Sequence, residues 1–518
     1  MTMRKVLTTT LAALLLAGGC SSPGPEGGKD VLRVLAGSEL ADLAPILKEA
    51  REETGVSVEL DYAGTLDGID QVASGEGARD HDAIWFSSNR YLELHPNVEI
   101  GTATPVMSSP VVLGVRPEAA RRLGWDASRP SWRQIAEAAA RREFTYGMSD
   151  PASSNSGFSA LVGVAIALNG GSDLDPSGIE AISGDLRRFF SAQLLTAGSS
   201  GWLSESFVRN GAEVDGLVNY ESVLKSLNAS GKLAEPLTLV YPSDGVATAD
   251  YPLTLLGTAS RESREKYGEL TAYLLRPEVQ QRISALTHRR PVAADAGGDG
   301  PSDLRELPFP GALETVDRLV AAFFDRLRRP SRTVYVLDVS GSMRGDRLDD
   351  LKAALVSLTG ADEGFRRFHN REEVTLLPFS TKPQPARRFT VPDDEPRPAL
   401  RQIRQVAEGL RAGGGTAIYD SLAQAYEATK RQVADDPDRF TSIVLMTDGE
   451  NTQGLEYSGF EDRYRKGLAV PGVPVFPVLF GEAEEREMND LASLTGGRAF
   501  DAREQSLETV FKEIRGYQ

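Results

Sequence analysis

The chain has 518 residues, too many for one ordinary domain, so two or three domains are expected. Hydrophobic residues make up 41% of it and charged residues 25%, which are proportions of a globular protein. The net charge of -17 argues against nucleic acid as a partner, because nucleic-acid binding needs a basic surface. Cys20 is the sole cysteine, so no internal disulfide and no thiolate metal site can form.

The first 30 residues have the features of a targeting segment followed by a tether. Two basic residues precede an apolar stretch, Val6–Ala17, and small residues then lead into Cys20. This order resembles a bacterial lipoprotein signal, although the usual leucine lies one place early, at Leu16. The resemblance implies removal of signal peptide 1–19, lipidation of Cys20 and a flexible tether over 20–30, with the protein anchored outside the cytoplasm on the cell membrane. An ordinary cleaved signal before an unmodified cysteine is the alternative.

From residue 31 onward, short strand-like apolar runs alternate with segments of helical periodicity. In the first block this alternation predicts a parallel α/β sheet. A second block of the same kind begins near Pro105. The expected strands are 31–35, 56–60, 83–86, 111–115, 237–241 and 251–256, and the expected helices are 41–54, 69–74, 132–142, 158–168 and 262–285.

The loops after these strands come in an order that resembles the extracellular solute-binding proteins of bacterial importers. The matching segments are Ala36–Leu40, Tyr62–Asp67, Asp82–Asn89, Ser109–Val115, Asp150–Phe158 and Tyr241–Gly245. The resemblance covers residues 31–300 and implies a bilobal, periplasmic-binding-protein-like α/β region. Lobe I would be 31–104 with 248–300, and lobe II would be 105–247. A linker and an amphipathic helix, 301–330, would either close this region or brace the last one.

A small solute in the cleft between the lobes is the corresponding expectation. Most candidate residues lie in loops that precede helices, where backbone N–H groups can hold an anion. Taken singly, each of these residues can instead be a helix cap. The candidates are Ser38, Gly64, Thr65, Ser87, Ser88, Asn89, Ser108, Ser109, Asn155, Ser156 and Tyr220.

The last region, 331–518, alternates strands and helices regularly and predicts a doubly wound sheet. In such sheets, sites lie beyond the carboxyl ends of the strands. The expected strands are 333–338, 373–379, 441–447 and 474–480, and the expected helices are 346–358, 397–411, 418–433, 484–494 and 505–515.

Five oxygen-bearing side chains are expected at that edge. Asp338, Ser340 and Ser342 come at the end of one apolar run, and Asp448 closes another. Thr416 follows a glycine triplet. Two carboxylates and three hydroxyls suit a hard cation, namely Mg²⁺, with Mn²⁺ or Ca²⁺ as alternatives.

The order D-x-S-x-S, then a lone threonine, then an aspartate at a strand end resembles the metal-ion-dependent adhesion site of von Willebrand factor type A domains. The resemblance implies a doubly wound, Rossmann-like domain. It also implies a divalent cation, held directly or through water by Asp338, Ser340, Ser342, Thr416 and Asp448, with one position open for a partner's carboxylate. A metal-free domain of the same fold is the alternative.

The sequence thus predicts a cell-surface lipoprotein that binds a protein or other carboxylate-bearing partner through the adhesion site. The alternative is the solute-binding component of an ABC-type importer, with the type A domain as a docking module. An enzyme is not expected, because the four histidines share no ligand spacing. The sequence also has no G-x-S-x-G elbow, Walker-type phosphate loop or H-E-x-x-H motif.

Overall fold

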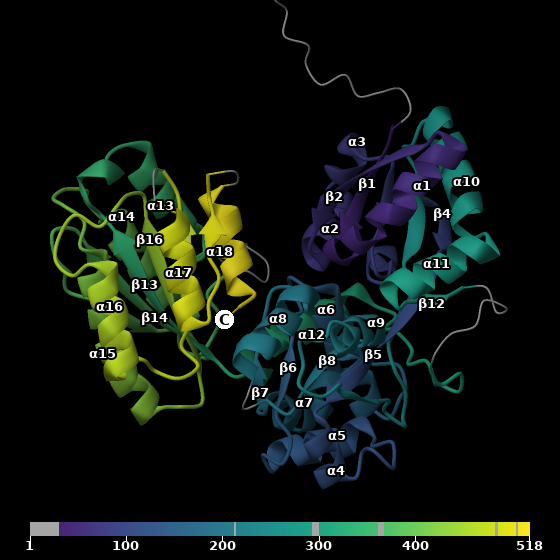
Figure 1. The fold of residues 1–518 in the computed structure, drawn as a ribbon, viewed down its shortest axis with the longest axis horizontal. Coiled ribbons are helices and arrows are strands. Elements are labelled where there is room, and N and C mark those ends of the chain that lie inside the picture. The colour runs from purple at the N-terminus through teal and green to yellow at the C-terminus, as the bar shows by residue number, and fades with distance from the viewer. Residues whose placement is uncertain are drawn as a thin grey trace, which may run out of the picture.

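The computed structural model arranges the chain in three α/β bodies, each built around its own sheet (Figure 1). The structure describes residues 31–211, 214–292, 300–360, 367–481, 485–503 and 506–517. The expected signal peptide 1–19 and the tether with Cys20 lie outside the described residues. Within the described ranges, no helix is long and apolar enough to cross a membrane.

The first sheet is mixed rather than parallel. Its strands are β1 (Val31–Gly37), β2 (Ser57–Ala63), β3 (Ala83–Trp85), β4 (Ile100–Pro105) and β11 (Pro252–Leu256). They lie in the order β2-β1-β3-β11-β4, and the first three are parallel as predicted. β11 runs antiparallel to both β3 and β4, so the prediction of a parallel sheet is wrong for this edge. The reason is that β11 returns from the second body and enters the sheet from its opposite end.

Helices cover this sheet and bury its apolar residues. In α1, Ile46, Leu47 and Ala50 are buried, and the helix ends at Gly55 with a left-handed φ of 78°, which glycine adopts without strain. α1 packs beside α10 and α11. The helical elements of this body are η1 (Ser38–Leu43), α1 (Ala44–Thr54), α2 (Thr65–Ala73), α3 (Gly77–Asp80), η2 (Leu92–Leu94), α10 (Arg261–Leu274) and α11 (Pro277–Thr287).

The second sheet has the long strand β5 at its centre. Its strands are β5 (Met107–Val115), β6 (Tyr146–Met148), β7 (Gln193–Leu195), β8 (Gly216–Tyr220), β9 (Thr238–Val240), β10 (Thr248–Ala249) and β12 (Arg290–Pro291). The main order is β10-β5-β8-β6-β7, and β9 and β12 also pair with β5. β12 follows α11 of the first body, so the chain crosses between the first two bodies here as well as before β5 and after β10.

The helices of the second body differ in how far they are buried. In α6, every residue from Phe158 to Leu168 except Ser159 is buried, so this helix forms the interior of the body. α5 begins with a capping box in which Ser131 and Gln134 satisfy each other's backbone N–H groups. The helices are α4 (Pro117–Leu123), α5 (Trp132–Ala140), α6 (Asn155–Leu168), α7 (Pro176–Phe190), α8 (Ser200–Asn210) and α9 (Glu221–Ala229).

The amphipathic helix expected within 301–330 packs against the second body. It forms α12 (Leu313–Ala322), which continues as a π-helical turn, η5 (Phe323–Leu327). Both elements pack against α7. Tyr91 of the first body also donates a hydrogen bond of 2.5 Å to Asp317 of α12. The segment therefore holds the first two bodies together before the chain enters the third.

The third sheet is parallel except at one edge. Its strands are β13 (Ser331–Asp338), β14 (Glu373–Phe379), β15 (Arg387–Thr390), β16 (Phe440–Thr447), β17 (Val475–Leu479) and β18 (Phe500–Asp501). They lie in the order β15-β14-β13-β16-β17-β18, with β15 antiparallel to β14. The chain thus forms a doubly wound sheet, as the sequence predicts.

Both faces of this sheet are covered, because successive residues of each strand point to opposite sides. Tyr335 and Leu337 of β13 pack in the core that includes α13, α14 and α18. Val334 and Val336 pack in the core that includes α15, α16 and α17. The helical elements are η6 (Gly341–Met343), α13 (Asp346–Ser357), α14 (Pro396–Glu408), α15 (Ile418–Asp435), α16 (Tyr457–Arg463), η8 (Tyr464–Leu468), α17 (Glu485–Thr495) and α18 (Leu507–Arg515).

The second and third bodies share a continuous apolar core. Phe207 and Leu217 of the second body belong to the same buried cluster as Tyr335 and Phe511 of the third. Figure 1 shows α18 on the side of the third body that faces α8. The third body is therefore packed against the second rather than only tethered to it.

Candidate functional site

Two loops meet where the neighbouring parallel strands β13 and β16 end, at the carboxyl edge of the third sheet. Asp338 is the last residue of β13, and Asp448 directly follows β16. The strand register fixes this proximity, because Leu337 lies opposite Met446. Both aspartates are buried, with 0% and 1% of their surface exposed. Charged carboxylates in such a place need compensating partners.

A chain of hydrogen bonds joins four of the five predicted metal ligands. The backbone N–H of Ser340 donates to Asp338 Oδ1 at 2.8 Å. The hydroxyls of Ser340 and Ser342 lie 2.9 Å apart. Ser342 Oγ in turn donates to Asp448 Oδ1 at 2.9 Å. The structure therefore brings these four side chains, from loops about a hundred residues apart in the chain, into one group.

The loop that carries the fifth predicted ligand, Thr416, is held against the same group. Gly341 N–H donates to the carbonyl of Gly414 at 2.9 Å, and Gly413 N–H donates to the carbonyl of Val339 at 2.8 Å. Gly414 has a φ of 89°, which explains why a glycine occupies this turn. Thr416 is 5% exposed, and its backbone N–H donates to Thr452 Oγ1 at 2.9 Å.

Two further residues of this site were not predicted from the sequence. Thr447 Oγ1 donates to Asp338 Oδ2 at 2.7 Å, so both carboxylate oxygens of Asp338 accept a hydrogen bond. Arg347, in the first turn of α13, forms an ion pair of 2.6 Å with Asp448 Oδ2. Thr447 precedes Asp448 in the chain and could have been suspected for that reason. Arg347 gives no comparable signal, because its position depends on how α13 packs.

The electrostatics of the group favour a bound cation. Burial, and to a smaller extent the charge of Asp448, raises the pKa of Asp338 to about 6. The donors are hard oxygens, which suit Mg²⁺, Mn²⁺ or Ca²⁺. A nearby positive charge stabilises ionised carboxylates. In the described part of the chain, no three His, Cys, Asp or Glu residues gather into a metal-binding group, so this candidate centre depends on its hydroxyls. Its residues fit a hard divalent cation.

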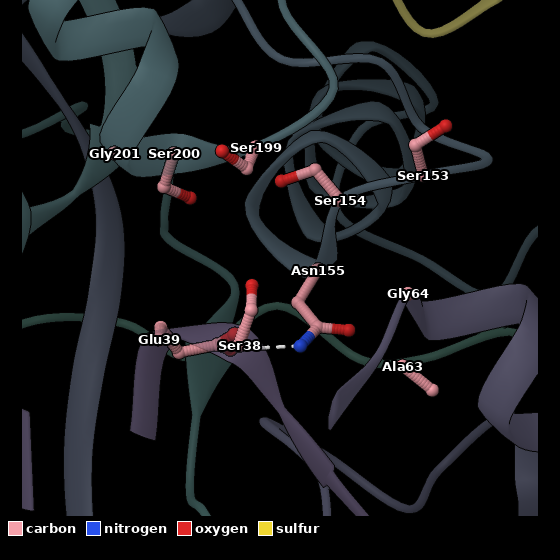
Figure 2. A pocket seen from close by; sticks show the side chains of 10 residues that line it. All are labelled: Ser38, Glu39, Ala63, Gly64, Ser153, Ser154, Asn155, Ser199, Ser200 and Gly201. Carbon is pink, nitrogen blue, oxygen red and sulfur yellow. Dashed lines mark hydrogen bonds between the residues drawn. The ribbon is translucent and has the colours of Figure 1, made fainter. Parts of the chain in front are cut away.

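A second candidate site is a pocket of about 250 Å³ between the first two bodies. Figure 2 shows side chains from two facing walls, with a hydrogen bond from Asn155 crossing to Glu39. The first body provides η1 and the turn before α2, and the second body provides the starts of α6 and α8. The lining residues are Ser38, Glu39, Ala63, Gly64, Ser153, Ser154, Asn155, Ser199, Ser200 and Gly201.

The pocket is surrounded by helix N-termini, whose unpaired N–H groups favour anionic oxygen. α2 begins after Gly64, α6 begins after Ser154, and α8 begins after Ser199. The side chain of Ser199 accepts a hydrogen bond of 3.3 Å from the N–H of Trp202, as a helix cap does. The pocket therefore lies among loops that precede helices, which is where most solute-binding residues were predicted.

Glu39 gives the pocket one carboxylate among hydroxyls. Asn155 Nδ2 donates to Glu39 Oε1 at 2.7 Å across the pocket. Burial raises the pKa of Glu39, and the hydrogen bond from Asn155 opposes that shift. Behind the wall, Ser156 Oγ lies 2.6 Å from the hydroxyl of Ser200 and 2.8 Å from that of Ser149. These bonds hold the starts of α6 and α8 together.

Three of the predicted solute-binding residues line this pocket: Ser38, Gly64 and Asn155. Ser156 lies behind its wall, and the side chain of Thr65 is outside the described residues. Sequence reasoning missed the other seven lining residues, although Ser154 and Ser199 could have been recognised as serines that precede a helix. The seven are Glu39, Ala63, Ser153, Ser154, Ser199, Ser200 and Gly201.

The other predicted solute-binding residues are not among those that line this pocket, because they pair with distant segments of the chain. Asn89 donates to Thr254 at 2.6 Å, Ser109 donates to Ser222 at 3.0 Å, and Tyr220 lies 3.2 Å from the hydroxyl of Ser159. Ser108 pairs with Arg290 within the second sheet. Ser87 and Ser88 line a separate cavity of about 30 Å³.

Comparison with known proteins finds two families along the chain. A model of bacterial extracellular solute-binding proteins matches residues 32–285, and a model of von Willebrand factor type A domains matches residues 333–450. The second match contains all five predicted metal ligands.

The similar curated proteins share only part of this chain. Inter-alpha-trypsin inhibitor heavy chain H4 is 32% identical in Sus scrofa and 30% identical in Homo sapiens, over 128 residues each. These alignments cover 24% of this chain and 13% of each heavy chain. An uncharacterized protein of Synechocystis is 31% identical over 161 residues, which is 31% of this chain and 33% of that protein.

Solved structures with similar folds are distant in sequence. The periplasmic binding protein AfuA from Actinobacillus pleuropneumoniae, with fructose-6-phosphate bound, is 13% identical with a TM-score of 0.43, covering 57% of this chain and 98% of that one. A periplasmic thiamin binding protein is 14% identical with a TM-score of 0.43, covering 60% and 99%. A von Willebrand factor type A protein from Catenulispora acidiphila is 19% identical with a TM-score of 0.30, covering 36% and 42%.

Proposed function

Since the chain combines a bacterial extracellular solute-binding domain with a von Willebrand factor type A domain, we propose that it binds a carboxylate-bearing protein partner through a metal-ion-dependent adhesion site at the cell surface. In this proposal Cys20 carries the lipid that anchors the protein to the membrane. The extracellular solute-binding domain supports a location outside the cytoplasm.

One observation carries the proposal: Asp338, Ser340, Ser342 and Asp448 form a continuous hydrogen-bonded group at the carboxyl edge of the third sheet. Together with Thr416, these residues would hold the cation. When bound, a divalent ion supplies positive charge and a coordination position for an anionic oxygen of the partner. The chain's own residues orient the donors, and the ion pair with Arg347 fixes one oxygen of Asp448.

The metal requirement is tested by calorimetric titration of the EDTA-treated full chain with MgCl₂. We expect saturable binding of about one ion per chain, and we expect excess EDTA to reverse it. MnCl₂ and CaCl₂ serve as the alternative hard cations. Absence of saturable heat with all three salts would reject the metal site and the adhesion mechanism that depends on it.

A second candidate function, solute capture for an ABC-type importer, is favoured by the pocket between the first two bodies. Its volume of about 250 Å³ is close to the lower end of the range for small-molecule sites. Asn155 and Glu39 from opposite walls meet inside it, so a polar solute would find partners on both sides. In this function the type A domain would be a docking module for an accessory protein.

Native mass spectrometry of the full chain purified from its own host tests this second function. We expect a copurified small molecule that denaturation releases. Asn155→Ala should lower its occupancy, since the loss of one hydrogen bond of about 1 kcal/mol weakens binding several-fold. Asn97→Ala, at an exposed asparagine outside the pocket, should leave occupancy unchanged. A chain free of small molecules would count against solute capture.

A further inference from the structure

The pocket wall provided by the second body is in contact with the C-terminal end of the type A domain. We infer that Gly516 and Tyr517 position this wall, so that solute binding depends on the docked type A domain. The inference rests on the proposed solute-binding function of the pocket. It makes these two residues positioning residues for the pocket, although they lie at the end of the third body and the lining residues belong to the first two.

Gly516 lies so close to both segments of the wall that a side chain would not fit without a shift. A Cβ atom placed on Gly516 would lie 2.8 Å from Ser153 Oγ and 3.0 Å from the Cα atom of Gly198. Ser153 lines the pocket itself, and Gly198 directly precedes the lining segment that begins at Ser199. A residue with a side chain at position 516 would therefore displace the starts of α6 and α8.

Tyr517 covers the second of these segments. A Cβ atom on Gly198 would lie 3.0 Å from the Tyr517 ring, which is itself only 7% exposed. Trp202, in the first turn of α8, packs edge-on against this ring with centroids 6.3 Å apart. Arg498 lies over Trp202 at 5.3 Å and donates to the Tyr517 hydroxyl at 2.8 Å. The N-terminus of α8 is thus packed against Tyr517 and Arg498 of the third body.

Charged residues fix the C-terminal end in this place. Arg515 is 6% exposed and donates to Glu372 at 2.6 Å, and Arg328 donates to the same oxygen at 2.5 Å. The charge of Asp150 also acts on both arginines. Asp150 Oδ1 accepts a hydrogen bond of 3.0 Å from the backbone N–H of Ser153, which lines the pocket. Arg328 and Arg515 therefore attract a residue that holds this segment of the wall in place.

This arrangement links two equilibria. A solute that orders the wall stabilises its contact with the C-terminal segment, and a docked C-terminal segment lowers the cost of ordering the wall for the solute. The opposite wall, which carries Ser38 and Gly64, belongs to the first body. The inference therefore predicts that a change at Gly516 acts on one wall of the pocket and not on the other.

Gly516→Ala in the full chain tests the inference, with amide hydrogen exchange as the readout. The backbone at Gly516 does not have a left-handed φ, so alanine adds only a Cβ atom. We expect exchange to quicken about tenfold in peptides covering 149–156 and 198–203, and to stay unchanged in peptides covering 36–40 and 63–68. Occupancy of the copurified solute should fall in parallel. Gly184→Ala, where a Cβ atom meets open space, is the matched control.

The outcomes separate this inference from the function on which it rests. If Gly516→Ala and Gly184→Ala give the same exchange in both wall segments, the inference is overturned. If wild-type protein carries no solute but the exchange changes as expected, solute capture fails while the positioning role stands. Should Gly516→Ala not fold, Tyr517→Ala removes the ring over Gly198 and must produce the same quickening around residues 198–203; unchanged exchange there would overturn the inference as well.

Discussion

Asp338→Ala is expected to remove Mg²⁺ binding, lowering the affinity by more than about a hundredfold. Replacement of an outer-shell partner alone commonly costs 10- to 100-fold, and Asp338 is one of only two carboxylates in the proposed ligand set. Both of its oxygens are fixed by hydrogen bonds from Ser340 and Thr447, so no other side chain can take its place without moving the loop. Calorimetric titration with MgCl₂ measures the effect.

A second substitution at this position, Asp338→Asn, distinguishes loss of metal from loss of fold. The raised pKa of Asp338 shows that its charged form is disfavoured by burial in the metal-free domain. Asp338→Asn removes the charge and keeps the shape, so in EDTA its melting temperature should equal or exceed that of the wild type. Added MgCl₂ should then stabilise the wild type and leave Asp338→Asn unaffected.

Asp346→Asn is the matched control, because Asp346 is an exposed aspartate in the first turn of α13. This variant removes the same charge eight residues away and should retain metal binding. If Asp338→Ala and Asp338→Asn both bind Mg²⁺ with the affinity of Asp346→Asn, the proposed ligand set is wrong. A response shared by all three variants would instead point to a general effect of net charge.

The meeting of Asp338 and Asp448 in the candidate metal site could be predicted from the sequence, because both aspartates lie at strand ends. Asp338 and Asp448 each close an apolar run, and parallel neighbouring strands necessarily end at the same edge of the sheet. Arg347 could not be predicted in this way. Its ion pair with Asp448 depends on the direction in which α13 leaves the loop, which no local pattern records.

The lining of the candidate solute pocket was harder to predict, because serines and asparagines after strands serve several purposes. Asn155 reaches into the pocket, whereas Asn89 bonds to Thr254, which is 165 residues away in the chain. Similarly, the hydroxyl of Ser109 donates a buried hydrogen bond to Ser222. Which of these polar residues faces the pocket is decided by how two distant segments pack, and composition does not carry that information.

Periodicity also failed where strands are very short or out of order. β6 and β7 have three residues each, too few for alternation to be seen. The sequence shows β11 clearly as an apolar run, but its antiparallel place between β3 and β4 follows from the path of the chain through the second body. Element type was therefore predictable, whereas sheet order at this edge was not.

Glu372→Gln is expected to destabilise the third body by about 3–5 kcal/mol, the usual cost of breaking a buried ion pair. Glu372 is 1% exposed and accepts hydrogen bonds from two buried guanidinium groups, those of Arg328 and Arg515. The substitution would leave both positive charges without their buried counterion. Chemical denaturation followed by circular dichroism measures the loss. Tryptophan fluorescence should also change if the C-terminal segment leaves the second body, because Trp202, one of the four tryptophans, packs against Tyr517.

The pH dependence of stability gives this prediction a distinct signature. The two arginines lower the pKa of Glu372 from 4.5 to about 2 against the opposing effect of burial. A depressed carboxyl pKa stabilises the fold fully above pH 4.5, and that contribution is lost as pH falls from 4.5 toward 2. The shift corresponds to about 3 kcal/mol at 1.36 kcal/mol per pKa unit. Glu372→Gln lacks this group, so its stability should fall less steeply than the wild type over that window.

His369, which lies beside these ion pairs, also makes the folded protein less stable as pH falls, but at a higher pH than Glu372 does. Burial lowers its pKa below 6.5, so the folded protein holds it neutral while the unfolded chain takes up a proton. Its contribution is present above pH 6.5 and declines below it. The charge of Glu372 opposes this shift, so the pKa of His369 should be lowered further in Glu372→Gln, and this variant should lose more of the contribution than the wild type as pH falls. The pH profiles of the wild type and Glu372→Gln should therefore run parallel above pH 6.5, and the loss that belongs to the Glu372 carboxyl itself should appear only below about pH 4.5.

Glu395→Gln is the control for the loss of one negative charge from the same domain, because Glu395 is exposed. Surface substitutions of this kind usually change stability by less than about 0.5 kcal/mol. Suppose that Glu372→Gln and Glu395→Gln unfold at the same denaturant concentration and with the same acid profile. The ion pairs of Glu372 with Arg328 and Arg515 then do not stabilise the packing of the third body against the second. In that case the shared apolar core that contains Phe207 and Phe511 would be what holds the third body against the second.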